Sequence, residues 1–170
     1  STWFYVKDWN YKFGQYKWIL WKGNPKTTSD SNSSGNIHSP SLWLYPLTNS
    51  LKVVTSTTDT SAVESCDIPN IPLMTWIHVA YVLNNRTVDI YINGKLRTRY
   101  KLKGVPKQNF GDLWVNLFGG FEGYLCRMQY FRRALDYQEV ENIVRQGPSK
   151  ESCSDSGDKP PYLDDDWWFN

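Results

Sequence analysis

Apolar residues recur at every second position in a short segment that ends in a tight-turn signal, Asn93-Gly94. Val88, Ile90 and Ile92 would share one face, which is the pattern of a β-strand packed on one side. The wetter face would carry Asp89, Tyr91 and Asn93. Both central residues of a type I′ turn need a positive φ, and Asn-Gly is the strongest short-range signal for such a turn. The sequence therefore predicts a β-hairpin that reverses at residues 93–94.

The second arm of this hairpin carries a row of basic residues. Leu96, Thr98, Tyr100 and Leu102 would share one face, and the other would carry Lys95, Arg97, Arg99, Lys101 and Lys103. In a regular strand the five cations would form a row about 27 Å long. We predict that this row binds a partner, either a sulfated or carboxylated glycan or an acidic protein surface. Alternatively, the charges protect an exposed edge strand from pairing with another sheet.

A short helix is predicted near the C-terminal end of this region. Asp136 can cap its first turn, and Glu139, three residues later, can bond back to the cap. Leu135 and Val140 occupy the positions of a hydrophobic staple, and Gly147-Pro148 ends the segment. We expect about ten helical residues here, and strands and loops elsewhere.

Four segments resemble, in their order and spacing, the laminin-G-like, concanavalin A-like jelly-roll family. They are Trp-Ile-His-Val-Ala at 76–80, Asp-Ile-Tyr-Ile-Asn-Gly at 89–94, Phe-Glu-Gly-Tyr-Leu at 121–125 and Arg-Ala-Leu-Asp-Tyr-Gln-Glu-Val at 133–140. The resemblance implies an all-β fold in which two antiparallel sheets pack face to face as a jelly-roll sandwich, here with one short C-terminal helix. More narrowly, residues 66–73 and 83–87 are similar to versions of this module encoded by large double-stranded DNA viruses.

We predict one folded domain over residues 1–148 and an extended tail over residues 149–170. The tail is polar until it reaches three carboxylates followed by three aromatic residues: Asp164, Asp165, Asp166, Trp167, Trp168 and Phe169. Such a segment is typical of a short element that orders on a partner. Its rings would supply buried area, and its acids would set the register against a basic surface. The alternative is that the tail folds back on its own domain.

The aromatic content is high, with nine Trp and eleven Tyr among 170 residues. In a sandwich we expect most of these rings to fill the layer between the sheets. The remainder would be surface platforms that stack on sugars or contact protein partners.

The sequence contains no catalytic or cofactor-binding constellation, so we predict a protein that is not an enzyme and needs no cofactor. Sandwich hydrolases carry two catalytic carboxylates, arranged as Glu-x-Asp-x-x-Glu or a close variant, and this run is absent. The oxygen ligands that calcium needs are scattered, as at Asp30, Asp59 and Asp112. His78 is expected to be a strand residue beside the core.

Cys66, Cys126 and Cys153 lack the close pairing of a zinc site. They would form either one disulfide with a free thiol, or three free thiols. The net charge of only +2 argues against nucleic acid as a partner. No apolar run approaches the length of a membrane span, and the start at Ser1, without a Met or a signal peptide, suggests a processed or partial chain.

Two functional hypotheses remain. The first is a structural interaction module, a minor capsid or virion component of a large DNA virus, which binds other structural proteins of the particle through its tail. The alternative is a carbohydrate-binding module that recognises glycans outside the cell or at its surface. A lectin does not need the tail, and a capsid block does not need exposed coplanar Trp residues. These two features therefore discriminate between the hypotheses.

Overall fold

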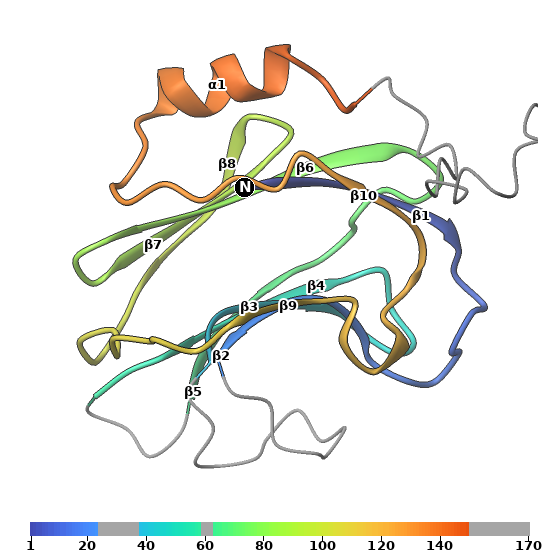
Figure 1. Cartoon of the computed structure of the whole chain (residues 1–170), viewed down its shortest axis with the longest axis horizontal. Coiled ribbons are helices and arrows are strands. Elements are labelled where there is room, and N and C mark those ends of the chain that lie inside the picture. Colours follow the sequence, from blue (N-terminus) through green and yellow to red (C-terminus); the bar gives the residue numbers. More distant parts are fainter. Residues whose placement is uncertain (24–37, 59–62, 150–170) are drawn as a thin grey trace, which may run out of the picture.

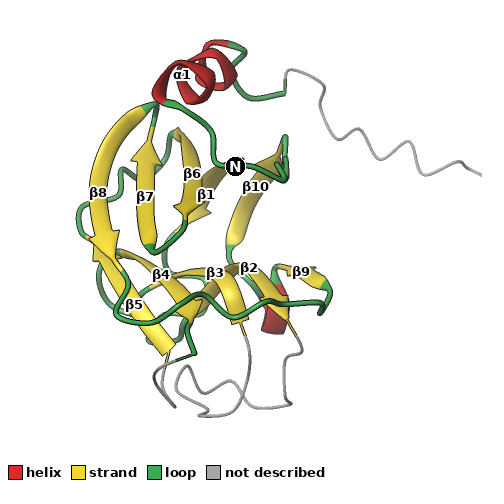
Figure 2. Ribbon diagram, turned by 90° about the vertical axis from the view of Figure 1, so that its left-hand side faces the viewer, coloured by secondary structure: helices red, strands yellow, loops and turns green. Residues whose placement is uncertain are grey.

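The computed structural model describes residues 1–23, 38–58 and 63–149. Two five-stranded antiparallel sheets lie face to face, and a short helix lies on the outside of one of them (Figures 1 and 2). This arrangement confirms the predicted all-β sandwich with one short helix.

Each sheet combines a run of consecutive strands with strands from distant parts of the sequence. Sheet A contains β1 (Thr2–Asp8), β6 (Trp76–Asn84), β7 (Thr87–Ile92), β8 (Lys95–Lys101) and β10 (Glu122–Cys126), in the order β10-β1-β6-β7-β8. Sheet B contains β2 (Lys17–Gly23), β3 (His38–Leu44), β4 (Leu51–Ser56), β5 (Val63–Ile68) and β9 (Leu113–Val115), in the order β5-β4-β3-β2-β9. A short 3₁₀ helix, η1 (Leu117–Gly119), follows β9, and α1 (Tyr137–Arg145) follows β10.

The layer between the sheets is mainly aliphatic. Its buried side chains come from alternate positions of both sheets and include Leu42, Leu44, Ile77, Ile90 and the two rings of Phe4 and Phe121. Trp18, Trp21 and Trp43 form a separate buried cluster with Val54. The expectation that most rings fill the inter-sheet layer is therefore wrong for these three tryptophans.

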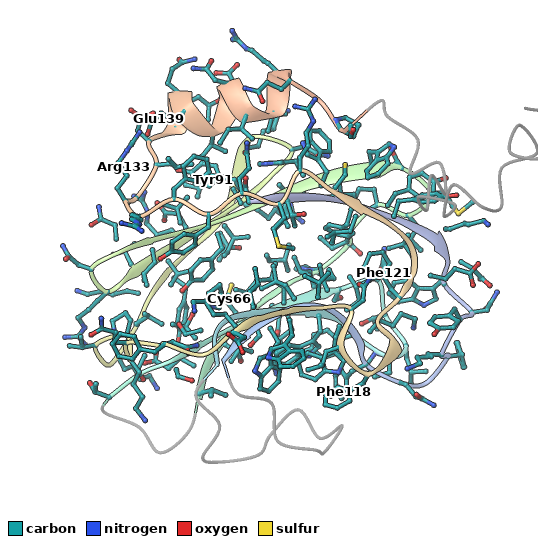
Figure 3. The ribbon with its side chains drawn as sticks, in the orientation of Figure 1. Cys66, Tyr91, Phe118, Phe121, Arg133 and Glu139 are labelled. Atoms are coloured by element: carbon teal, nitrogen blue, oxygen red, sulfur yellow. The ribbon has the colours of Figure 1, made fainter. Side chains whose placement is uncertain are left out.

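The predicted hairpin is present, and α1 covers part of it. Asn93 and Gly94 have φ values of 49° and 79°, as a type I′ turn requires. Tyr91 was expected on a wetter face but is only 6% exposed, because it packs with Ala80, Val82 and the α1 residue Val140. Figure 3 shows Tyr91 beneath the helix.

The start of α1 has the predicted capping box. The Asp136 side chain accepts a hydrogen bond from the Glu139 backbone N–H, and the Glu139 carboxylate accepts one from the Asp136 backbone N–H. Arg133 forms an ion pair with the same carboxylate. These bonds satisfy backbone donors that an uncapped helix would leave without partners.

Glu64 connects the two sheets at one edge of the sandwich. It lies on β5, is 8% exposed, and accepts hydrogen bonds from the backbone N–H groups of Lys103 and Gly104 and from the Tyr100 hydroxyl, at 2.8–3.1 Å. Burial raises the pKa of this carboxyl, but the hydrogen bonds, led by that from Gly104, lower it by a larger amount. The net pKa therefore lies below the usual value. The charged form of Glu64 is therefore favoured in the folded state.

We predict that Glu64→Gln lowers the free energy of unfolding by about 1.5–3 kcal/mol, because bonds to a charged acceptor are lost. The stability that the depressed pKa provides is complete above the usual value of 4.5 and is lost as the pH falls through the lower folded value. Urea unfolding at pH 7 and at acid pH measures both effects.

Glu122→Gln is the matched control for this prediction, since Glu122 is an exposed carboxylate at the start of β10. A loss of stability no greater than that of the control would contradict the role given to Glu64.

Candidate functional site: the outer face of sheet B

Strand register arranges the outer face of sheet B in two rows. The first row runs from β5 to β2 through Asp67, Lys52, Trp43 and Trp18. The second runs from β5 to β9 through Ser65, Val54, Ser41, Trp21 and Trp114. The face is therefore polar at the β5 end and aromatic at the β9 end.

A register shift in β2 puts two tryptophans on this face. The pairing of β2 with β3 shifts between Trp18 and Leu20, and both Ile19 and Leu20 belong to the core between the sheets. Trp18 and Trp21, three residues apart, consequently lie together on the outer face. Without the shift, strict alternation would turn one of them toward the core.

The rings on this face form a continuous series of contacts. Trp18 lies 4.4 Å from Trp43 and 4.9 Å from Trp21, measured between ring centroids. Beyond Trp43, the series continues to Tyr16 and then Tyr45, at 6.4 and 6.1 Å. Packing of this kind contributes about 0.5–1.5 kcal/mol per pair beyond simple burial.

Only part of this series is accessible. Trp18, Trp21 and Trp43 are at most 4% exposed, whereas Trp114 on β9 is 42% exposed and Phe118 in η1 is 36% exposed. Phe118 lies 6.2 Å from Trp18 in an edge-to-face arrangement. In Figure 3, Phe118 lies on the far side of sheet B from Phe121, which points between the sheets. The accessible rings are thus at the β9 edge.

Phe118 is held in an unusual backbone conformation. Its φ is 54°, and Asn116, two residues earlier, has a φ of 51°. The β1–β2 connection holds this turn, because the Tyr11 hydroxyl donates to the Gly119 carbonyl at 3.0 Å and the Lys12 ammonium donates to the Phe118 carbonyl. Backbone strain in non-glycine residues is concentrated at functional sites, where surrounding structure maintains it.

At the polar end of the face, a cation and an anion, Lys52 and Asp67, both lie beside the ring of Tyr45. The Tyr45 hydroxyl donates to Asp67 Oδ1 at 2.9 Å, and Lys52 Nζ lies 5.6 Å from the centre of the Tyr45 ring. Burial, followed by the bond to Asp67, raises the pKa of Tyr45 to about 12. Tyr45 therefore remains a hydrogen-bond donor at neutral pH, beside a cation and an anion that can bond to ligand hydroxyl or carboxylate groups.

The sequence matches one family model over residues 1–141, which is that of the concanavalin A-like lectin/glucanases superfamily. The chain belongs to this superfamily. No curated protein sequence matches the chain significantly.

Solved structures show the same fold at low sequence identity. The CBM40 domain of the Ruminococcus gnavus IT-sialidase, bound to α2,3-sialyllactose, has a TM-score of 0.64 and 15% identity, with 84% of this chain and 79% of that chain covered. The binding domain of botulinum neurotoxin serotype G has a TM-score of 0.57 and 13% identity, and the match covers 85% of this chain and 35% of the toxin domain. A SAP-like pentraxin from Limulus polyphemus has a TM-score of 0.50 and 13% identity, with 88% and 70% covered.

The five basic residues that were predicted to share one face of β8 do not share it. Ile90 pairs with Thr98 but Tyr91 pairs with Leu96, so Arg97 is an extra residue in the strand. Because this bulge reverses the alternation, Lys95 lies on the opposite face from Arg99 and Lys101. The single five-cation face was therefore a wrong prediction.

The bulge also separates the environments of these cations. Arg99 forms an ion pair with Asp89 through two bonds of 2.7 Å, and Arg97 donates to the Pro69 carbonyl on the sheet B side at 3.5 Å. Lys103 lies beyond the end of β8, where its backbone bonds to Glu64. Lys95 and Lys101 are exposed. A role for these residues in partner binding stays a prediction.

The other predicted site residues lie outside the described part of the chain. They are Asp164, Asp165, Asp166, Trp167, Trp168 and Phe169. Sequence reasoning missed Lys52, Trp114 and Phe118, because nothing local indicates that β4 and β9 flank the same tryptophans. A Trp in a short apolar segment between glycine-rich turns was the available signal for Trp114.

Residues 1–23, 38–58 and 63–149 contain no group of three or more His, Cys, Asp or Glu side chains that could hold a metal ion. In these same ranges, Cys66 and Cys126 are free thiols, and the first is buried between the sheets. None of the helices described is long and apolar enough to span a membrane.

His78 is a buried strand residue. It is fully buried on β6 beside Trp3, with ring centroids 5.2 Å apart, and among the described residues neither ring nitrogen has a hydrogen-bond partner. Burial, followed by the nearby amino terminus, lowers the pKa of His78 to about 4. The imidazole is therefore neutral in the folded state at physiological pH.

We predict that stability falls as the pH drops from 6.5 to about 4, because the unfolded chain binds a proton at His78 over this range and the folded chain does not. The loss would reach about 3 kcal/mol. Urea titrations at several pH values measure it, and His78→Phe should flatten this part of the profile. An unchanged slope in the variant would contradict the assignment.

Proposed function

We propose that this concanavalin A-like domain binds glycans through the outer face of sheet B and does not catalyse their cleavage. The observation that carries the proposal is Trp114, an exposed tryptophan directly opposite Trp21 on a face that is aromatic at one end and polar at the other. Exposed Trp on such a face distinguishes a lectin from a purely structural block.

The chemistry of the face suits a sugar. A pyranose presents apolar C–H groups on its faces and hydroxyl groups on its edges, so a ring surface beside a few hydrogen-bonding groups can hold and orient it. Trp114 and Phe118 supply accessible rings; the buried Trp21 lies opposite Trp114 and the buried Trp18 contacts Phe118, which favours a rigid surface. Lys52 and Asp67 supply charged bonding groups at the β5 end of the first row, on the same face. A rigid platform reduces the entropy lost on binding.

The arrangement supports binding rather than hydrolysis. Glycoside hydrolases place two carboxylates about 5–9.5 Å apart across the scissile bond. The two rows of the sheet B face contain a single carboxylate, Asp67, and it is already bonded to Tyr45. A glycan on this face would therefore be held and released unchanged.

Glycan binding is preferred to the virion role that the sequence first suggested. The similar structures include a carbohydrate-binding module bound to a sialylated sugar, although their low identity establishes the fold alone. The basic row, which would have met an acidic neighbour, is divided by the bulge at Arg97. We accordingly place the protein outside the cell or at its surface, where glycans are displayed.

We predict that the full chain binds a subset of an array of neutral and sialylated glycans. For a bound glycan, Trp114→Ala should weaken the affinity about tenfold or more in calorimetric titration, which corresponds to about 1.4 kcal/mol. Lys52→Ala should weaken the binding of carboxylated glycans selectively, since it removes the cation of the face.

Tyr130→Ala is the matched control, because Tyr130 is 77% exposed and lies outside both rows. If Trp114→Ala loses no more affinity than this control, the binding face is wrong. If no glycan binds the folded chain, glycan binding itself is wrong.

A further inference from the structure

A second aromatic surface lies on the outer face of sheet A. Tyr124, Tyr5 and Trp76 are directly opposite one another on β10, β1 and β6. Their ring centroids are 5.8–6.3 Å apart, and Tyr124 is 54% exposed. We call these three residues the sheet A platform. It does not belong to the glycan face, because the two faces point away from each other.

The helix covers the neighbouring part of sheet A. The α1 residue Val140 packs on Ala80, Val82 and Tyr91, which belong to β6 and β7. Figures 1 and 2 show the helix above this side of the sheet, away from the β10 edge. The platform thus occupies the part of the outer face that α1 leaves open.

The described chain ends close to the platform. The Ser149 backbone N–H donates to Cys126 Sγ at 3.4 Å. Cys126 is opposite Trp3 on the same face and two residues from Tyr124, a separation of about 7 Å along a strand. Residues 150–170 therefore continue from a point beside the platform.

The charges beside the platform match the order of residues that follow. Arg127 lies at the Cys126 end of β10, is exposed, and bonds to the Gln146 side chain at the end of α1. Glu122, also exposed, lies at the opposite end of β10. A segment that enters at Arg127 and runs along β10 toward Glu122 would meet a cation first, then the level at which the three rings lie side by side across β10, β1 and β6, and then an anion. The sequence at residues 164–169 offers three carboxylates and then three rings.

We propose that residues 164–169 dock on the sheet A platform of their own molecule. The Asp residues would lie near Arg127, and Trp167, Trp168 and Phe169 would pack on Tyr124, Tyr5 and Trp76. Repulsion by Glu122 would oppose a shift of the acids farther along β10.

The connection permits this docking. The fifteen peptide units from Ser149 to Asp164 can span up to about 50 Å, far more than the platform requires. Tethering through a connection of this length places the segment at an effective concentration in the millimolar range, so modest aromatic contacts suffice to hold it.

The test is nuclear magnetic resonance on the full chain without glycan. The triple variant Trp167→Ala, Trp168→Ala, Phe169→Ala should shift the Trp76 indole N–H and the Tyr5 and Tyr124 amide resonances. Tyr124→Ala should lower the heteronuclear NOE of residues 164–169 to values typical of a flexible segment. Asp164→Asn, Asp165→Asn, Asp166→Asn should weaken docking partly, and added salt should have the same effect in the wild type.

Phe110→Ala is the control, because Phe110 is 86% exposed and lies before β9. It should leave the platform resonances unchanged. Unchanged platform resonances in the triple variant, or equal tail NOE values with and without Tyr124, would overturn the proposal. Shifts that depend on protein concentration would also overturn it, in favour of docking between two copies. Trp114→Ala should not affect these signals, so the result is independent of glycan binding.

Discussion

The packing of an aliphatic layer between two sheets is the constraint on which the rest of this molecule depends. Leu, Ile and Val side chains, mostly from alternate positions, occupy that layer, and Phe4 and Phe121 are its buried rings, with Tyr81 and Tyr100 packed against it. The large tryptophans of β2 and β3 are consequently excluded to the outer face of sheet B. There they form a second buried cluster, against which the accessible ring of Phe118 packs. The aromatic end of the proposed glycan face therefore follows from how the sandwich fills its interior.

The two long edges of the sandwich are built differently. At one edge, the buried carboxylate of Glu64 on β5 accepts bonds from the segment that follows β8, and this joins the sheets. At the other edge, the three-residue strand β9 exposes Leu113, Trp114 and Val115 by 42–46%. A joined edge fixes the relative position of the sheets, so the opposite edge can present side chains to a ligand without loss of the fold.

Much of the fold was predictable because its signals are local. The Asn93-Gly94 turn and the Asp136 capping box each depend on residues that are close in sequence, and both are present. The outer faces were less predictable, because they depend on register. Neither the shift at Trp18 nor the extra residue at Arg97 has a Gly or Pro to indicate it. Each reverses the side-chain alternation: the first keeps both Trp18 and Trp21 on the outer face, and the second divides the expected basic face.

The close approach of Trp18 to its two neighbours has an optical consequence. Trp43 and Trp21 lie within 5 Å of it, at interplanar angles of 47° and 57°. The intense far-ultraviolet transitions of indoles at this separation and tilt couple strongly, so the cluster should produce an exciton couplet in the far-ultraviolet circular dichroism spectrum. Because Phe118 contacts the same cluster, the molecule contains an intrinsic chromophore that reports on events at its surface without any added label.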